Sequence, residues 1–203
     1  LIEAVEQGQI NLLIGTQMMA KGHHFPALAR VGVVDADLGL AGGDLRAGER
    51  TWQLLHQISG RAGRADVAGK VLLQTYAPDH PVMQALAAHD REGFYAQEKA
   101  AREQAGMPPF GRLAALIVEG PNEAQVKQVA QTLARTAPDY QDVAVFGPAP
   151  APLAMLRGKF RYRLLVKAGR RVHLSRLLRS WRDAQKIPSA VRLKIDVDPY
   201  SFM

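Results

Sequence analysis

The sequence predicts an α/β protein in which a partial parallel-sheet domain is followed by a smaller α+β domain. Three observations support this prediction. The first half of the 203-residue chain alternates short apolar runs with amphipathic stretches, which is typical of strands and helices in a parallel sheet. A segment rich in Gly and Pro, which ends the preceding helix, then occupies residues 106–111. The second half has the order strand, helix, strand, strand, helix, strand, which forms two split βαβ units.

The first half contains three apolar runs and one amphipathic stretch, in which Trp52 and Leu55 recur at helical spacing. Asp35 and Asp37, around the end of the second run, allow two interpretations: a metal-binding pair, or a loop fixed by local hydrogen bonds. The loop is favoured, because aspartate side chains commonly bond to nearby backbone in turns. The predicted elements are strands Asn11–Gly15, Val31–Asp35 and Lys70–Thr75, and a helix over Ala47–Ser59.

Residues 81–106 are predicted to connect two domains. From Pro81 to about Gln104 the sequence has no further Pro and no β-branched run, so it favours one long helix that is interrupted at most by Gly93. The stop at 106–111 ends this helix. We therefore expect domains over residues 1–80 and 107–203, joined by this connecting helix.

The second half is expected to form a four-stranded antiparallel sheet with both helices on one face. Prolines at 148, 150 and 152 favour an extended, non-helical loop in the middle connection. The predicted strands are Arg112–Glu119, Val143–Phe146, Phe160–Lys167 and Val191–Val197, and the predicted helices are Glu123–Thr136 and Val172–Gln185.

The first motif, Gly15–Phe25 (GTQMMAKGHHF), directly follows a predicted strand. Gly15 and Gly22 allow the backbone to approach a ligand closely, and Thr16 offers a hydroxyl and an amide to a phosphate oxygen. The histidine pair after Gly22 is not expected to bind metal, because the side chains of adjacent residues diverge. The motif therefore predicts a phosphate-binding segment.

The second motif, Gln57–Arg64 (QISGRAGR), lies at the end of a predicted helix. Arg61 and Arg64 are three residues apart with glycines beside them, so both guanidinium groups can reach one highly charged phosphate. This is the arrangement of an arginine finger, which stabilises charge on a transferring γ-phosphoryl group. Taken alone, the motif is equally compatible with a Gly-rich turn that carries solvated arginines.

In order, spacing and context, the two motifs resemble motifs V and VI of superfamily 2 helicases. The resemblance narrows to the PriA family of primosomal helicases. The segments GTQMMAKGHHFPAL, VVDADLGL, DLRAGERTWQLLHQISGRAGRA and QTYAPDHPV resemble the second helicase lobe of that family, and MPPFGRLAALIVEG, GPAPAPLAMLRGKFRYRLLVKA and KIDVDPYSFM resemble its C-terminal domain. The resemblance covers essentially the whole chain. It implies that residues 1–80 are the C-terminal part of a RecA-like lobe 2 and that residues 107–203 bind DNA and partners.

The resemblance implies a catalytic role for three residues of the second motif. Arg61 and Arg64 match the motif VI arginines that contact the ATP γ-phosphate. Gln57 matches the residue that positions this motif against the nucleotide and the other lobe. The implied activity of the complete protein is ATP-driven 3′ to 5′ DNA unwinding and fork binding in replication restart.

The resemblance also implies roles in the first motif. Thr16 and Lys21 match motif V positions that couple the DNA backbone to the nucleotide, and Gly22 accompanies them beside the bound nucleotide. His24 departs from the pattern, because related proteins often have Asp at this position near the ribose. The resemblance places His24 beside the nucleotide, near the ribose.

Two motifs of a complete helicase are absent from the sequence: it has no GxxxxGK[ST] segment and no acidic DExH-like strand end. The resemblance implies that ATP and Mg²⁺ are bound mainly by a preceding lobe that this chain lacks. It also implies a cysteine-ligated zinc module, for which the chain has no cysteine. Because the chain begins with Leu1 rather than Met, we expect a C-terminal fragment that does not hydrolyse ATP by itself.

The net charge of +7 belongs to the second half of the chain. Residues 1–110 contain 10 Lys and Arg against 12 Asp and Glu, whereas residues 111–203 contain 16 against 7. Residues 157–194 contain 13 basic side chains and one acidic side chain. Such a segment favours binding to nucleic-acid phosphates, with a solvated basic face as the alternative.

Basic residues alternate through the third strand of the second half. We expect strand alternation to place them on one face and the aromatic residues on the other, where core packing is favoured over base stacking. The helix that follows adds a second basic surface. Both favour binding to the backbone of single-stranded or forked DNA, with an affinity that falls as salt rises. The strand residues are Arg157, Lys159, Arg161, Arg163 and Lys167; the helix residues are Arg171, Arg176, Arg179, Arg182 and Lys186; the residues expected in the core are Phe160, Tyr162 and Trp181.

The resemblance further implies protein partners: the acidic, apolar C-terminal tail of single-stranded DNA-binding protein (SSB), and other primosome proteins. A tail of this kind needs a cation for its carboxylate and an apolar slot. Arg171 beside Leu174 and Leu178 would supply both. We therefore expect Arg171 to bind the SSB tail.

Composition excludes several classes of protein. Without cysteine there are no disulfides, cysteine-ligated zinc sites or thiol nucleophiles. No apolar run approaches the roughly 18 to 20 residues that span a bilayer, and the N-terminal residues do not resemble a signal peptide. We expect a bacterial cytoplasmic protein, associated with the nucleoid at replication forks, without a membrane partner.

Two other functions stay open. One is a different superfamily 2 translocase, which the split βαβ domain after Pro109 disfavours. The other is a non-enzymatic nucleic-acid-binding adaptor with vestigial helicase motifs. The reading frame immediately upstream of Leu1 decides between this adaptor and the helicase.

Overall fold

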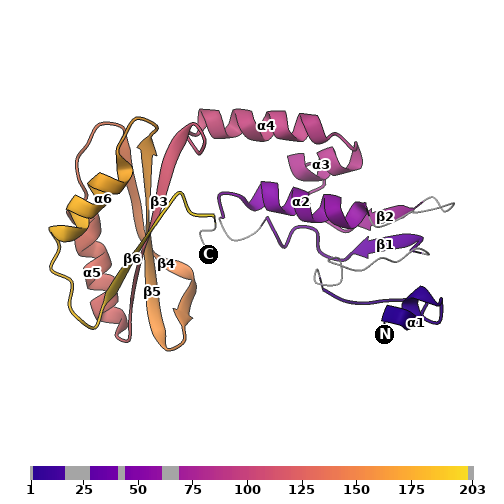
Figure 1. The fold of residues 1–203 in the computed structure, drawn as a ribbon, viewed down its shortest axis with the longest axis horizontal. Coiled ribbons are helices and arrows are strands. Elements are labelled where there is room, and N and C mark those ends of the chain that lie inside the picture. The colour runs from indigo at the N-terminus through magenta and orange to yellow at the C-terminus, as the bar shows by residue number, and fades with distance from the viewer. Residues whose placement is uncertain (1, 17–27, 41–43, 61–68, 201–203) are drawn as a thin grey trace. The chain divides into compact units, whose positions relative to one another are not determined.

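The computed structural model divides the chain into two compact units, residues 1–96 and 97–203 (Figure 1). The division falls within the segment 81–106 that the sequence predicts to connect two domains. Across the described part of the chain, no helix is long and apolar enough to cross a membrane. The described residues are 2–16, 28–40, 44–60 and 69–200.

In the first unit, a parallel pair of strands is accompanied by short helices. β1 and β2 pair with Arg30 opposite Lys70 and Val33 opposite Leu73. The buried core is small and lies mainly on the helices: Trp52 and Leu55 of α2 pack with Phe94 and with residues of α3. The elements are α1 (Ile2–Glu6), β1 (Arg30–Val33), α2 (Ala47–Ser59), β2 (Lys70–Leu73), α3 (Pro81–Ala87) and α4 (Arg91–Gln104), which continues into the second unit.

The prediction of a strand over Asn11–Gly15 is wrong. The described residues 11–16 form no strand, and the side chains of Leu12 and Ile14 are 75% and 86% exposed. A strand needs a neighbour to pair its backbone groups, and the described part of the first unit gives this segment none. The apolar run by itself therefore does not establish the strand.

The prediction of one helix from Pro81 to Gln104 is also wrong, because residues 88–90 separate α3 from α4. His89 has a positive φ of 52°, which ends α3. The Asp90 carboxylate then accepts a hydrogen bond from the Gly93 amide at 2.8 Å, which caps the start of α4. Gly93 itself lies inside α4, where a side chain would collide with this carboxylate.

The second unit is a four-stranded antiparallel sheet in the order β4-β5-β3-β6. Both helices lie on one face of the sheet, as Figure 1 shows. The predicted β-α-β-β-α-β topology is therefore confirmed. The elements are β3 (Gly111–Gly120), α5 (Glu123–Arg135), β4 (Val143–Leu156), β5 (Lys159–Gly169), α6 (Leu174–Asp183) and β6 (Arg192–Val197).

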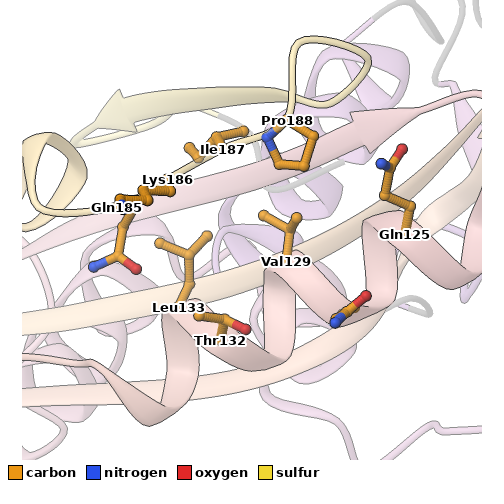
Figure 2. A pocket seen from close by; sticks show the side chains of 9 residues that line it. Gln125, Val129, Thr132, Leu133, Gln185, Lys186, Ile187 and Pro188 are labelled. Atoms are coloured by element: carbon orange, nitrogen blue, oxygen red, sulfur yellow. The ribbon is translucent and has the colours of Figure 1, made fainter.

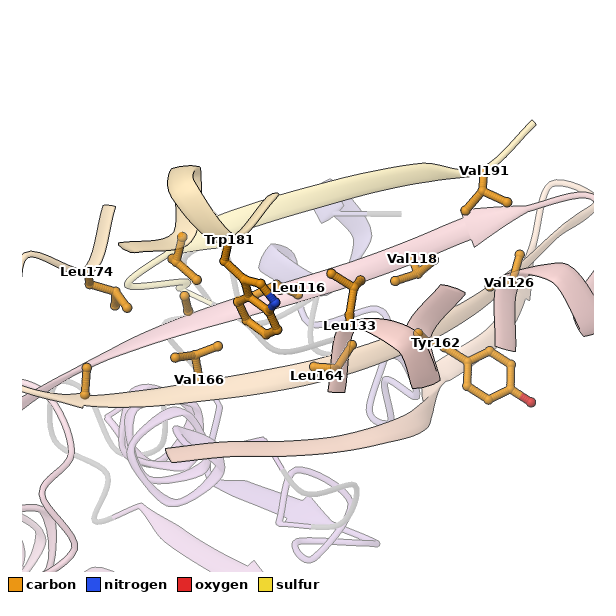
Figure 3. Close-up of a cluster of buried hydrophobic side chains, with 14 residues drawn as sticks. Leu116, Val118, Val126, Leu133, Tyr162, Leu164, Val166, Leu174, Trp181 and Val191 are labelled. Carbon is orange, nitrogen blue, oxygen red and sulfur yellow. The ribbon is translucent and has the colours of Figure 1, made fainter. Parts of the chain in front are cut away.

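One continuous core fills the space between the sheet and its helices (Figure 3). Leu116 of β3 and Leu164 of β5 meet Val126 of α5 and Trp181 of α6 there. Tyr162 also belongs to this core, and its hydroxyl donates to Glu123 Oε1 at 3.1 Å. The core positions predicted for Tyr162 and Trp181 are confirmed.

The proline-rich connection is extended and non-helical, as predicted, but it belongs to the edge strand β4 and not to a loop. Its register against β5 shifts between Phe146 and Ala149 and again between Pro150 and Met155. Proline lacks the amide that a central strand must donate, so it is tolerated at a sheet edge and in bulges. The second shift places four residues of β4, 151–154, opposite the single residue Arg161 of β5.

Candidate functional site

Most of the predicted nucleotide-binding residues lie outside the described residues. Thr16 is described and exposed, and Gln57 is exposed near the end of α2. Their expected contacts with DNA and nucleotide stay predictions. The residues outside the described part of the chain are Lys21, Gly22, His24, Arg61 and Arg64.

Helix α2 leads directly to the arginine motif and is held firmly. The Trp52 ring stacks on His56, with centroids 4.6 Å apart, and on Phe94 of α4, with centroids 5.1 Å apart. Trp52 is buried, whereas Gln57 on the same helix faces solvent. Its amphipathic sequence therefore anchors α2 on one side and leaves Gln57 exposed, four residues before Arg61 in the sequence.

Asp35 and Asp37 fix a loop through local hydrogen bonds, as the sequence favoured. Asp35 Oδ1 accepts from the Asp37 amide, and Asp37 accepts from the Thr75 hydroxyl and the Tyr76 amide, each at 2.6 Å. The hydrogen bond from Thr75, followed by that from Tyr76, lowers the pKa of Asp37. Among the described residues, no group of three or more His, Asp or Glu could hold a metal ion.

The basic residues of β5 lie on the face of the sheet that the helices leave uncovered. Tyr162 and Leu164 belong to the helix-side core, so the alternating positions point to the other face. Arg157 is an exception to the prediction, because β5 begins only at Lys159 and Arg157 lies in the preceding turn. We call the uncovered side the open face; its β5 residues are Lys159, Arg161, Arg163 and Lys167.

A buried acid lies among the cations of the open face. Glu119 of β3 is opposite Arg161 on β5 and Arg192 on β6, and Lys194 Nζ lies 2.8 Å from its Oε1. Burial acts to raise the pKa of Glu119, but the Lys194 hydrogen bond and the charges of Lys194, Lys159 and Arg161 outweigh it and lower the pKa. Glu119 therefore stays ionised and compensates part of the positive charge.

Arg192 and Lys194 extend the open face onto β6, and the sequence analysis missed them. Both are exposed, while Leu193 and Ile195 between and beside them pack toward the core. The signal was present, because β6 has the same alternation of basic and apolar residues as β5. Arg161 at the centre is 9% exposed, and its Nε makes no hydrogen bond with the described part of the chain.

The prediction of an apolar slot beside Arg171 is wrong. Leu174 and Leu178 are 0% and 2% exposed and belong to the core beneath α6. The helix spacing that places them together also turns them inward, away from solvent. Arg171 itself is exposed ahead of α6, and so are the predicted basic residues Arg176, Arg179 and Arg182.

A half-open groove of about 190 Å³ lies between α5 and the segment that follows α6 (Figure 2). Its apolar lining comes from Val129, Leu133, Ile187 and Pro188, and Lys186 provides a cation. Amide and hydroxyl groups complete the lining. They belong to Gln125, Gln128, Thr132 and Gln185.

Comparisons with known proteins agree with this architecture. Residues 103–200 match the family model described as the primosomal protein N C-terminal domain. The whole chain is 47% identical over 202 residues to the replication restart protein PriA of Rickettsia felis, and covers 31% of that relative. The chain belongs to the PriA family.

More distant members of the PriA family match along the whole chain as well. The Synechocystis protein is 41% identical over 203 residues, with 99% of this chain and 24% of the relative covered. The Bacillus subtilis protein is 37% identical over 208 residues, with 100% of this chain and 26% of the relative covered. The chain therefore spans 24% to 31% of the length of these PriA proteins, each of which is named a replication restart protein.

Proposed function

We propose that this chain is the C-terminal part of an ATP-dependent 3′ to 5′ DNA helicase that restarts replication at abandoned forks. The observation that carries the proposal is the succession, in one PriA-family chain, of a parallel-strand unit with both helicase motifs and a βαββαβ unit with a basic open face. Strand separation needs a motor and a DNA-binding surface, and these two units correspond to them.

In this proposal the first unit completes an ATP site. Arg61 and Arg64 hold the γ-phosphate, with Gln57 at the end of α2 positioning them. Gly22 and His24 lie beside the nucleotide, and Thr16 and Lys21 contact the DNA backbone. ATP and Mg²⁺ are bound mainly by a preceding lobe, where Mg²⁺ offsets phosphate charge, and the family's zinc module also lies elsewhere. The 203-residue chain alone is then inactive as an ATPase.

The open face of the second unit is the proposed DNA-binding surface. Lys159, Arg161 and Arg163 alternate along β5, and Arg192 and Lys194 continue the positive charge on β6. Phosphate oxygens accept hydrogen bonds from lysine and arginine side chains of this kind.

DNA-stimulated ATP hydrolysis by the complete gene product tests the helicase proposal. Arg64→Ala should lower turnover by about 10³- to 10⁵-fold, because an arginine finger stabilises charge that develops only in the transition state. Arg135→Ala, an exposed arginine at the end of α5, is the matched control and should leave turnover unchanged. Near-parental turnover of Arg64→Ala would remove the finger assignment, and an inactive parent would favour the adaptor instead.

We further propose that the SSB tail binds in the groove between α5 and the segment after α6. This tail needs an apolar slot and a cation. The groove combines Val129 and Ile187 with Lys186, whereas the leucines beside Arg171 are buried. Arg171 would then at most contact acidic residues of the tail outside the groove.

Binding of a fluorescent peptide with the SSB tail sequence separates the two positions. Lys186→Ala should weaken binding several-fold, because the peptide carboxylate loses its partner, and Arg171→Ala should weaken it less. Lys127→Ala, an exposed α5 lysine that does not line the groove, is the control. The opposite ranking, with Arg171→Ala the more damaging change, would return the site to Arg171.

A further inference from the structure

The end of the β4–β5 hairpin exposes apolar side chains. Leu153, Met155 and Leu156 are 55%, 57% and 43% exposed. The last two cross-strand pairs are Met155 with Phe160 and Leu156 with Lys159. We call residues 153–159 the hairpin tip; Figure 1 shows both strands running to this end of the sheet.

The turn of the hairpin tip is tight. Arg157 and Gly158 alone connect Leu156 with Lys159, and their φ angles are 50° and 74°. Positive φ at both central residues is the mark of a type I′ turn, whose twist matches that of the strands. Asn or Gly usually occupies the first position, so an arginine there accepts an unfavourable backbone conformation. The tip is therefore a narrow ribbon that ends in a cation.

The apolar side chains leave the ribbon on both faces. Met155 shares a face with its partner Phe160, which is on the helix side with Tyr162. Leu156 shares the opposite face with Lys159. Docking on a flat protein surface would cover one face of the ribbon. Insertion between two apolar surfaces would cover both.

The charge of the hairpin identifies the kind of partner. From residue 143 to residue 167 the sequence contains five basic residues and no acidic residue. Arg157 follows the exposed Leu156 and Lys159 is its cross-strand partner, so a suitable partner offers apolar surfaces beside negatively charged groups. Stacked base pairs between two phosphate backbones have this composition, and aliphatic side chains are known to enter base steps in this way.

We propose that the hairpin tip is a wedge that enters a base step of duplex DNA. Leu156 and Met155 contact the two separated base pairs, while Arg157 and Lys159 bind the flanking phosphates. This inference rests on the proposed DNA-binding function. It adds that the hairpin tip is the place where the stacking of adjacent base pairs is broken. At a fork junction, where base pairs open most readily, the wedge favours the unstacked state.

A fork oligonucleotide with 2-aminopurine at the junction tests the wedge with the 203-residue chain. Unstacking of this base raises its fluorescence, so the parent should give a rise at saturation. Leu156→Ser and Met155→Ser, singly and together, should lose this rise. Leu153 has no cross-strand partner and is not one of the two residues that contact the bases, so Leu153→Ser should keep the rise. Tyr140→Ser removes a side chain that is 56% exposed but precedes β4 and lies away from the tip, and should keep the rise. Thermal unfolding verifies that each variant folds.

Salt dependence separates failure of the wedge from failure of DNA binding. Lys159→Ala should reduce the slope of log affinity against log salt by about one, whereas Leu156→Ser should leave this slope unchanged. A parent that binds the fork without a fluorescence rise, or a Leu156→Ser variant that keeps the rise, would overturn the wedge and mark the tip as a protein contact. A parent that does not bind the fork would overturn both the wedge and the DNA-binding role of the open face.

Discussion

The two units differ in how they bury their apolar residues. In the second unit the strands and both helices share one core, and Leu116, Leu164 and Val166 are at most 1% exposed. In the first unit the described core is small, and Leu72 of β2 is 55% exposed although its strand is apolar. Leu12 is exposed as well.

This difference separates a unit with one continuous core from a unit that leaves apolar side chains exposed among its described residues. Parallel sheets are usually covered on both faces, and strands such as β1 and β2 are marginal as an isolated pair. The exposed apolar residues of the first unit are consistent with a partial helicase lobe. In the antiparallel second unit, both helices and all four strands follow one another in sequence and share one core.

Matched leucine truncations test this comparison through the largest expected change in the free energy of unfolding. Leu116→Ala should lower the free energy of unfolding of the second unit by about 2–5 kcal/mol, because it leaves a cavity in a dense core. Leu55→Ala is equally buried but lies in the first unit, and should leave the second unit unchanged. Hydrogen exchange followed by mass spectrometry across a urea series reports the two units separately.

Leu12→Ala is the control for these truncations, because its exposed side chain should change neither unit. The comparison fails if all peptides of the chain exchange in one shared transition that Leu116→Ala and Leu55→Ala shift by the same amount. In that case the two units would stabilise one another. The exposure of Leu72 would then not indicate that the second unit is the more independently stable of the two.

The same difference explains which structural predictions succeeded. The βαββαβ order could be predicted because each strand pairs with a partner present in the sequence, and the bounds of α2 followed from its apolar periodicity. The strand predicted over residues 11–15 from its apolar residues alone is wrong, since a strand also needs a neighbour with which to pair. The edge position of Pro150 depends on the finished sheet order, which no local pattern encodes.

Predictions about the site failed where side-chain direction decided the outcome. Leu174 and Leu178 are adjacent to a cation in sequence, but the amphipathic face of α6 turns them into the core. In the sequence, Glu119 belongs to a largely apolar strand. Only the sheet register places it between Arg161 and Arg192. The family could be inferred from the order of the motifs, whereas the side-chain contacts depend on the folded structure.

A smaller effect should distinguish the acids of the two units. Asp37 and Glu119 both have a lowered pKa, but Asp37 bonds to the neutral groups of Thr75 and Tyr76, whereas Glu119 is surrounded by cations. Glu119→Gln should cost about 1.5 kcal/mol, near the low end for a hydrogen bond between charged groups because Lys194 is half exposed. Urea unfolding at pH 7 measures this cost.

The pH and salt dependence of that cost sharpens the comparison. A carboxylate with a lowered pKa stabilises the folded state above its unfolded pKa, about 4.3 for glutamate, and the contribution is lost as the pH falls through the folded value. The second unit should therefore weaken below about pH 4.3 in the parent and less in Glu119→Gln. Near 1 M salt, where the Debye length is about 3 Å, the contribution of Glu119 should shrink because its cationic partners are screened. The loss caused by Asp37→Asn in the first unit should change little, since neutral donors hold that carboxylate. Equal salt sensitivity of both variants would show that Glu119 is held by its hydrogen bond rather than by the charge of the open face.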